Sequence, residues 1–309
     1  CSLAFPFKIR SSFPTSLPEV RSVSSKPQLR IRELNILGIP ALTWFIFFLL
    51  APIVIVFLLS FLKRGTYGGL DWTFQLSNYP RIFEIVYFKI FYESFKLSLV
   101  TSILCLILGY PVAWAMATAP RSARSFLVMF LAIPFLTNLI IRVYALRIFL
   151  GIDGPVQSML HTLGIEFDPF LFSQNKILVL YGMITAYLPF MVFPIYSALE
   201  KFDFTLVEAA KDLGASEWKV LTRVLIPNTR IAIANGLTLV FVPCLGEFVI
   251  PDLLGGAKSM LIGNLITEQF LKARDWPFGA ALSTILIILL IIVPFIIRRI
   301  VCGKVERPA

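Results

Sequence analysis

Residues 200–230 read EKFDFTLVEAAKDLGASEWKVLTRVLIPNTR and separate two long apolar stretches of the chain. The segment is too periodic for a plain connector, because its apolar residues recur at helical spacing in two successive groups. The two groups are Leu206, Val207, Ala210 and Leu213, then Trp218, Leu221, Val224 and Leu225. Gly214 between them suits a helix end, Ser216 suits the start of a second helix, and Pro227 ends the pattern. The segment therefore predicts two short helices that meet at a glycine turn.

The composition around this segment is that of a membrane protein. Of the 309 residues, 58% are hydrophobic and 15% are charged, and the mean hydropathy is +0.83. Soluble domains carry about 25% charged residues and are about 45–50% apolar. These values exclude a disordered chain, a nucleic-acid-binding arm and an ordinary cytosolic enzyme.

Six stretches are long and apolar enough to cross a bilayer as helices. A hydrocarbon core about 30 Å thick requires about 20 such residues. The stretches are 38–62, 94–119, 125–150, 177–199, 231–251 and 277–297. None shows the two-residue alternation of a β-barrel strand. The sequence therefore predicts an all-α integral membrane protein with six transmembrane helices in residues 38–300.

The positions of lysine and arginine predict the orientation. With both termini cytoplasmic, the inside segments carry 17 of these residues and the outside loops carry 8, as the positive-inside rule requires. Residues 1–37 are rich in Ser and Pro and are expected to form a disordered cytoplasmic tail, with a transit peptide as the less favoured alternative. Residues 301–309 are expected to form a cytoplasmic C-terminal tail.

The sequence lacks the residues of a metal centre or a nucleotide site. Its four cysteines are far apart, and its one histidine, His161, has no second histidine to pair with. The one Gly-Lys pair, Gly303-Lys304, is followed by Val305, so no phosphate-binding loop of the G-x-x-x-x-G-K-[ST] type is present. We therefore expect no cofactor in this chain. An intramembrane protease is also disfavoured, because the apolar stretches lack a catalytic constellation.

The spacing within residues 200–227 resembles the EAA loop of the permeases of ABC importers. The resemblance rests on Glu208-Ala209-Ala210, on Gly214-Ala215 four residues later, and on Val224-Leu225-Ile226-Pro227. It implies a type I importer permease in which this loop is the cytoplasmic coupling helix on an ABC ATPase dimer that binds the ATP. The expected coupling residues are Glu208, Ala209, Ala210, Gly214, Ala215 and Pro227. The alternative is an amphipathic helix on the lipid surface, which Trp218 and Lys219 would suit.

Further stretches resemble the polyamine branch of these permeases, which serves spermidine and putrescine importers. They are LGYP at 108–111, TN at 137–138, IRVY at 141–144, LPFM at 188–191, GEFVIPDLLGG at 246–256, GN at 263–264 and RDWPFG at 274–279. The resemblance covers the chain from about residue 35 to the last helix. It implies a second homologous permease subunit, a periplasmic or extracellular solute-binding protein, an inner-membrane location, and no nucleic acid partner.

The chemistry of a polyamine directs attention to acidic and aromatic residues near the ends of the helices. A polyamine carries ammonium groups spaced by methylenes, which suit carboxylates and aromatic faces. Glu247 lies between Pro243 and Pro251 in an apolar stretch, where a carboxylate is costly and normally has a partner or faces a water-filled path. The expected residues of a substrate path are Glu247, Asp252, Tyr144, Tyr187, Asp275 and Trp276.

Structural roles are open for several of these residues. Glu247 could form an ion pair with Arg142 or with a partner subunit, Asp252 could cap a helix, and Asp275 could form a loop salt bridge with Arg274. The cargo is open too, since permeases for iron, thiamine or sulfate share the EAA loop. The acidic residues favour a cationic solute, whereas an anion importer requires basic residues in its path.

Overall fold

The computed structural model describes residues 31–151, 154–164, 176–256 and 260–303. The chain forms two units, Cys1–Pro52 and Ile53–Ala309. Of the predicted tails 1–37 and 301–309, residues 1–30 and 304–309 lie outside the described residues, whereas α1 already begins at Ile31 and α13 continues to Cys302. The elements of the first half are α1 (Ile31–Leu59), β1 (Leu62–Arg64), β2 (Leu70–Phe74), α2 (Asn78–Ile82), α3 (Ile85–Thr118), α4 (Arg121–Leu136), α5 (Leu139–Leu150) and α6 (Pro155–Thr162). Those of the second half are α8 (Lys176–Glu200), α9 (Thr205–Asp212), α10 (Glu217–Val220), η1 (Leu221–Leu225), α11 (Ile226–Gly246), η2 (Pro251–Gly255), α12 (Ile262–Leu271) and α13 (Trp276–Cys302).

The predicted fold class is confirmed. Among the described residues, five helices are long and apolar enough to span a membrane, and a sixth span results if the bent pair Arg121–Pro134 and Leu139–Thr162 is counted as one. None of the side chains in the apolar window of the first span, Gly38–Leu59, is buried in the structure. The one departure from an all-helical chain is the antiparallel hairpin of β1 and β2.

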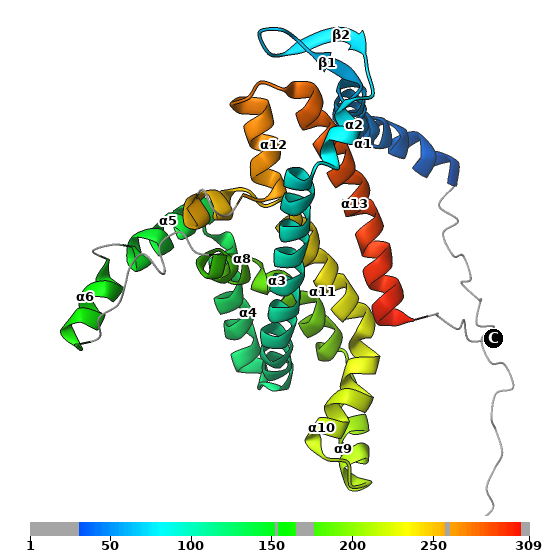
Figure 1. The fold of residues 1–309 in the computed structure, drawn as a ribbon. Helices are drawn as coiled ribbons and strands as arrows, with labels where there is room; N and C mark the ends of the chain where they lie inside the picture. Colours follow the sequence, from blue (N-terminus) through cyan, green and yellow to red (C-terminus); the bar gives the residue numbers. More distant parts are fainter. Residues whose placement is uncertain (1–30, 152–153, 165–175, 257–259, 304–309) are drawn as a thin grey trace, which may run out of the picture. The chain divides into compact units, whose positions relative to one another are not determined.

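Helices α3, α8, α11 and α13 form the bundle of the second unit (Figure 1). Their close packing depends on glycine. A Cβ at Gly236 of α11 would lie 2.7 Å from the Sδ of Met191, and one at Gly109 of α3 would lie 3.1 Å from the Cγ of the same residue. Fully buried Met191 of α8 therefore fills the space left by two glycines on its neighbours. Small residues of this kind allow membrane helices to approach closely.

The third predicted span, 125–150, is not one continuous helix. Helix α4 ends at Leu136, Thr137 is extended, and α5 begins at Leu139 after a bend of 80°. The side chain of Asn138 accepts a hydrogen bond of 2.8 Å from the backbone N–H of Ile140 and so caps α5. The prediction missed this break because apolar periodicity alone does not reveal a cap inside an apolar run.

The fifth span also differs from the prediction at both ends. Pro227 does not end the second short helix, because α10 continues through the π-helical segment η1 into α11, over Glu217–Gly246. Proline lacks the N–H of a normal helical bond, and a π-helical turn accommodates this by shifting the bonding pattern. The Asn228 side chain donates to the Val224 carbonyl at 2.7 Å. At the other end α11 stops at Gly246, so Glu247 lies in an extended break rather than inside a helix.

We predict that Gly236→Val destabilises the bundle by about 1–3 kcal/mol, because the added atoms overpack the contact with Met191. Gly246→Ala is the control, since a Cβ at Gly246 meets no atom within 4 Å. The measurement is the thermal unfolding midpoint of the purified protein. Equal midpoints for the two variants would contradict the importance of the glycine contact.

Candidate functional site

The loop between α8 and α11 has the geometry expected of a docking segment. Helix α9 ends in a turn where the N–H of Ala215 donates to the Ala210 carbonyl at 3.0 Å and the N–H of Gly214 donates to the Lys211 carbonyl at 2.9 Å. Gly214 has φ +77°, a left-handed conformation that glycine adopts without strain. The predicted glycine turn after a first short helix is therefore present, but the helix that follows the turn is the beginning of the long segment Glu217–Gly246.

The apolar residues of this loop divide between the bundle and the solvent-exposed surface. Partly buried residues pack against the core, namely Val207, Ala210, Ala215, Leu221 and Val224. By contrast, Leu213 is 89% exposed, Trp218 is 72% exposed and Leu206 is 50% exposed. Glu208 and Ala209 are exposed beside them. Exposed large apolar side chains beside charged residues are a feature that interaction surfaces share.

Two polar contacts stabilise the shape of the loop. Lys211 and Glu217 form an ion pair of 3.2 Å across the Gly214 turn. The backbone N–H of Thr205 donates to the Asp203 carboxylate at 3.0 Å at the start of α9. Hydrogen bonds from Thr205 lower the pKa of Asp203 below its ordinary value. The loop is thus a preformed surface rather than an irregular connector.

The second candidate site is a buried pair formed by Glu247 and Tyr187. Glu247 is 8% exposed. Its Oε1 accepts hydrogen bonds from the backbone N–H groups of Phe248, Val249 and Ile250 at 3.1, 2.9 and 3.4 Å. Its Oε2 accepts a hydrogen bond from the hydroxyl of Tyr187 on α8. The carboxylate therefore caps the helical segment that follows the break and joins it to α8.

The segment around α12 packs closely on the Glu247 break. A Cβ at Gly263 would lie 2.6 Å from the Gly246 carbonyl oxygen and 2.9 Å from that of Glu247. The Asn264 side chain donates to the Phe248 carbonyl at 2.9 Å. The backbone of the break is therefore supported from a second side by the start of α12.

The other residues expected in a substrate path are not gathered around this pair. Tyr144 and Trp276 are 46% and 43% exposed, and Asp252 is exposed in η2. Within the described ranges, no ion pair joins Glu247 to Arg142, and Nε and Nη1 of Arg142 are buried without a hydrogen-bond partner. The structure therefore joins Glu247 and Tyr187 by a hydrogen bond. Among the described residues, no side-chain hydrogen bond or ion pair links the other four expected residues to this pair.

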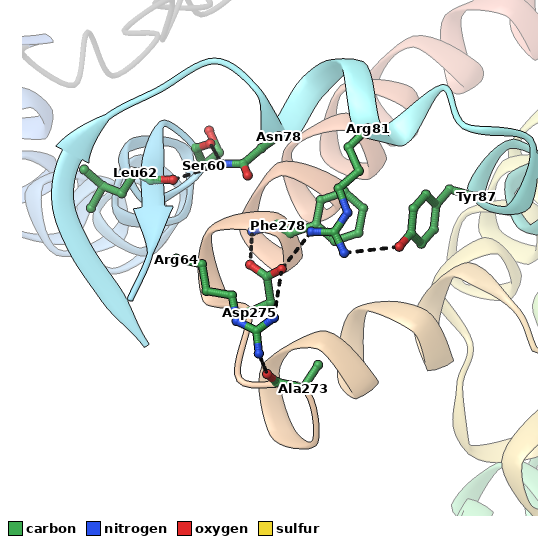
Figure 2. Close-up of polar contacts among 9 residues, drawn as sticks. All are labelled: Ser60, Leu62, Arg64, Asn78, Arg81, Tyr87, Ala273, Asp275 and Phe278. Carbon is green, nitrogen blue, oxygen red and sulfur yellow. Dashed lines mark hydrogen bonds and ion pairs between the residues drawn. The ribbon is translucent and has the colours of Figure 1, made fainter. Parts of the chain in front are cut away.

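Asp275 lies in a different arrangement, which we call the Asp275 clasp and define as Arg64, Arg81, Asp275 and Phe278 (Figure 2). Asp275 is 2% exposed. Its Oδ2 accepts from Nη1 of Arg81 at 2.8 Å and lies 4.0 Å from Nη1 of Arg64. Its Oδ1 accepts from the backbone N–H of Phe278 at 3.3 Å and caps α13.

Aromatic rings complete the environment of Arg81 in the clasp. Its guanidinium lies 4.0 Å from the ring centre of Phe278, and it donates to the hydroxyl of Tyr87 at 3.3 Å. Partial burial opposes the charged form of Arg81, but hydrogen bonds to Asp275 and Tyr87 outweigh burial and raise its pKa. The clasp joins the hairpin of β1 and β2 and helix α2 to the start of α13.

Sequence reasoning missed the partners of Asp275. Arg274, at the turn before α13, has a left-handed backbone with φ 50°. The ion pairs of Asp275 are instead with Arg81 and Arg64. The motif Asp275-Trp276-Pro277 carried a usable signal, since an aspartate followed by proline marks the first turn of a helix. Nothing in the sequence indicated Arg81, which lies 194 residues from Asp275.

We predict that Asp275→Asn destabilises the protein by about 1–3 kcal/mol, because two guanidinium groups lose their carboxylate. Asp252→Asn changes the same chemistry at an exposed position and is the matched control. Thermal unfolding of the purified protein compares the two. An equal effect of both variants would mean that the clasp contributes little to stability.

Comparison with known proteins places the chain in a family. Residues 105–307 match the family described as "Binding-protein-dependent transport system inner membrane component". The spermidine/putrescine transport system permease protein PotB of Escherichia coli (strain K12) is 41% identical over 266 residues, which are 85% of this chain and 97% of PotB. PotB of Haemophilus influenzae is 39% identical over 267 residues, 85% of this chain and 93% of that protein.

A shorter match and a solved structure agree with this placement. PotC of E. coli, also a spermidine/putrescine transport system permease protein, is 36% identical over 111 residues, 36% of this chain and 42% of PotC. The fold resembles a chain of a bacterial ABC transporter involved in the import of alginate, with TM-score 0.70 and 18% identity, covering 90% of this chain and 97% of that one. The chain therefore belongs to the family of inner membrane permease components of binding-protein-dependent transport systems.

Proposed function

We propose that this chain is one permease subunit of an ABC importer for polyamines. The observation that carries the proposal is the 41% identity over nearly the whole length of a spermidine/putrescine permease. The buried carboxylate of Glu247 beside Tyr187 supports a cationic cargo. The partial likeness to PotC supports pairing with a second, homologous permease subunit.

In the proposed coupling step, the loop from α9 to α10 docks on a separate ATPase subunit in the cytoplasm, with both termini of this chain on the same side. The exposed side chains Leu206, Leu213 and Trp218 supply apolar contact area, and Glu208 supplies a charge for a basic partner. Helix α10, η1 and α11 form one continuous helical segment of 30 residues, about 45 Å long at 1.5 Å per residue. Movement of the docked loop therefore acts directly on the far end of α11, where Glu247 lies.

In the proposed cargo path, Glu247 receives an ammonium group. Each of the two oxygens of a carboxylate has about two lone-pair sites. Three backbone N–H groups occupy Oε1, while Tyr187 occupies one site on Oε2. The remaining site on Oε2 is chemically suited to a donor from an ammonium group, and the ring of Tyr187 suits the methylenes. A solute-binding protein on the opposite face from the ATPase would deliver the polyamine, and ATP-driven alternating access would complete the import.

We predict that Gly214→Val abolishes ATP-driven uptake, because a branched residue at φ +77° costs about 1–2 kcal/mol and changes the turn that orients the docking surface. Gly164→Val is the control, because Gly164 has φ +73° outside this loop and, like Gly214, no atom within 4 Å of an added Cβ. Uptake, membrane content and ATPase activity are measured for both. Normal uptake in the Gly214 variant would refute the coupling role.

We predict ATP-dependent uptake of labelled putrescine or spermidine by vesicles carrying the whole transporter, with sulfate and thiamine as control solutes. Glu247→Gln should reduce polyamine uptake about 10- to 100-fold, since a hydrogen bond to a charged group contributes about 1.5–3 kcal/mol. The glutamine retains an oxygen that caps Phe248, Val249 and Ile250. Tyr187→Phe keeps the charge and should have a smaller effect.

The outcomes separate cargo from residue role. Polyamine uptake that is unchanged in Glu247→Gln would keep the cargo and assign Glu247 to structure alone. An assembled, ATPase-active transporter that takes up sulfate or thiamine but no polyamine would refute the proposed cargo.

A further inference from the structure

A cavity of about 490 Å³ lies between the first half of α3, the start of α8 and the residues before α12. Three lysines line it, Lys89 and Lys96 from α3 and Lys176 from α8, together with one acid, Glu93. Apolar side chains, among them Leu97 and Val100, form the rest of the lining. The cavity is at the end of α8 that is far from the α9–α10 loop, because α9 follows the other end of α8.

The charges of the cavity do not cancel. Glu93 forms an ion pair of 2.7 Å with Lys176. Lys89 and Lys96 have no ion pair or hydrogen bond with any residue that the structure describes. Lys89, Glu93 and Lys96 are spaced at i, i+4 and i+7, so they share one face of α3. Glu93 is the one carboxylate among three lysines and also attracts Lys96 and Lys89. The cavity therefore keeps a net positive charge above an apolar lining, which disfavours a polyamine and suits an anion.

The length of α3 sets the depth of these lysines in the bilayer. Its 34 residues extend about 51 Å, whereas the hydrocarbon core is about 30 Å thick. Arg121 and Arg124 follow the end of α3 and mark one boundary of the hydrocarbon. About 20 residues back from Thr118, the other boundary falls near Leu99. Lys96 then lies at the level of the lipid headgroups, Glu93 at their outer edge and Lys89 above them, while Val100 reaches the hydrocarbon.

The wall of the cavity is a packed part of the fold. The backbone N–H of Ile262 donates to the Ser94 hydroxyl at 2.8 Å, which holds the residues before α12 against α3. Leu261, which lines the cavity, is 5% exposed. We propose that this cavity binds an anionic phospholipid, with the phosphate between Lys89, Lys96 and Lys176 and the upper acyl carbons against Leu97 and Val100.

The test uses the whole transporter, purified with its permease and ATPase partners and titrated with phosphatidylglycerol or phosphatidylcholine in native mass spectrometry. Phosphatidylglycerol should bind more tightly than phosphatidylcholine. The double variant that carries Lys89→Gln and Lys96→Gln leaves the Glu93–Lys176 pair intact. It should weaken phosphatidylglycerol binding about 25-fold, at roughly fivefold per lysine. Lys272→Gln, at an exposed lysine after α12, should leave binding unchanged, and the double change to arginine should preserve it.

Val100→Trp is a second variant that keeps every lysine and fills the apolar floor, so it too should weaken binding of the lipid. Equal affinity for the two lipids, or unchanged binding in the glutamine double variant, would overturn the proposal. Displacement of phosphatidylglycerol by millimolar inorganic phosphate would assign the cavity to a free anion instead. Failure of the double variant to assemble with the second permease, with lipid binding unaffected by Val100→Trp, would assign the lysines to the subunit interface.

Discussion

A peptide group inside a bilayer has no water to bond with, and this constraint governs the two breaks after Leu136 and Gly246 in the described helices. The break after Gly246 is permitted because the Glu247 carboxylate accepts from three backbone N–H groups. The break after Leu136 is permitted because the Asn138 side chain accepts from the N–H of Ile140. Each break is followed by a change of chain direction or helix type, so the polar side chains that permit the breaks also shape the interior of the bundle.

The two candidate sites lie at the two ends of one continuous helical segment. The helical segment from Glu217 to Gly246 begins at the docking loop and ends next to Glu247. Met191, wedged between Gly109 and Gly236, keeps its neighbours α3 and α11 in close contact with α8. A tightly packed interior transmits displacement rather than absorbing it. The proposed coupling surface lies at one end of this segment and the buried carboxylate of Glu247 lies next to the other end. This arrangement agrees with the proposed coupling of ATPase docking to the cargo path.

Much of this organisation could be predicted from the sequence. Apolar length revealed the spans, and the spacing around Gly214 revealed the glycine turn after a short helix, because both are local properties. The bond between Tyr187 and Glu247 could not be predicted, since it joins residues 60 positions apart through the packing of α8 against the break. Trp218 shares its apolar stripe with Leu225, yet Trp218 is 72% exposed and Leu225 is fully buried, because periodicity identifies a face without saying what covers it. The coupling and cargo roles of these residues remain predictions.

The Asp275 clasp also has a consequence for the order in which the chain is assembled. Arg81 and Asp275 are 194 residues apart, and Asp275 is the cap of the last span. A chain made from its N-terminus inserts its early spans long before Asp275 exists. Until then, Arg64 and Arg81 lack their carboxylate, and the hairpin is not joined to the bundle. Closure of the clasp is therefore a late event in biogenesis, one that only a chain complete through α13 can reach.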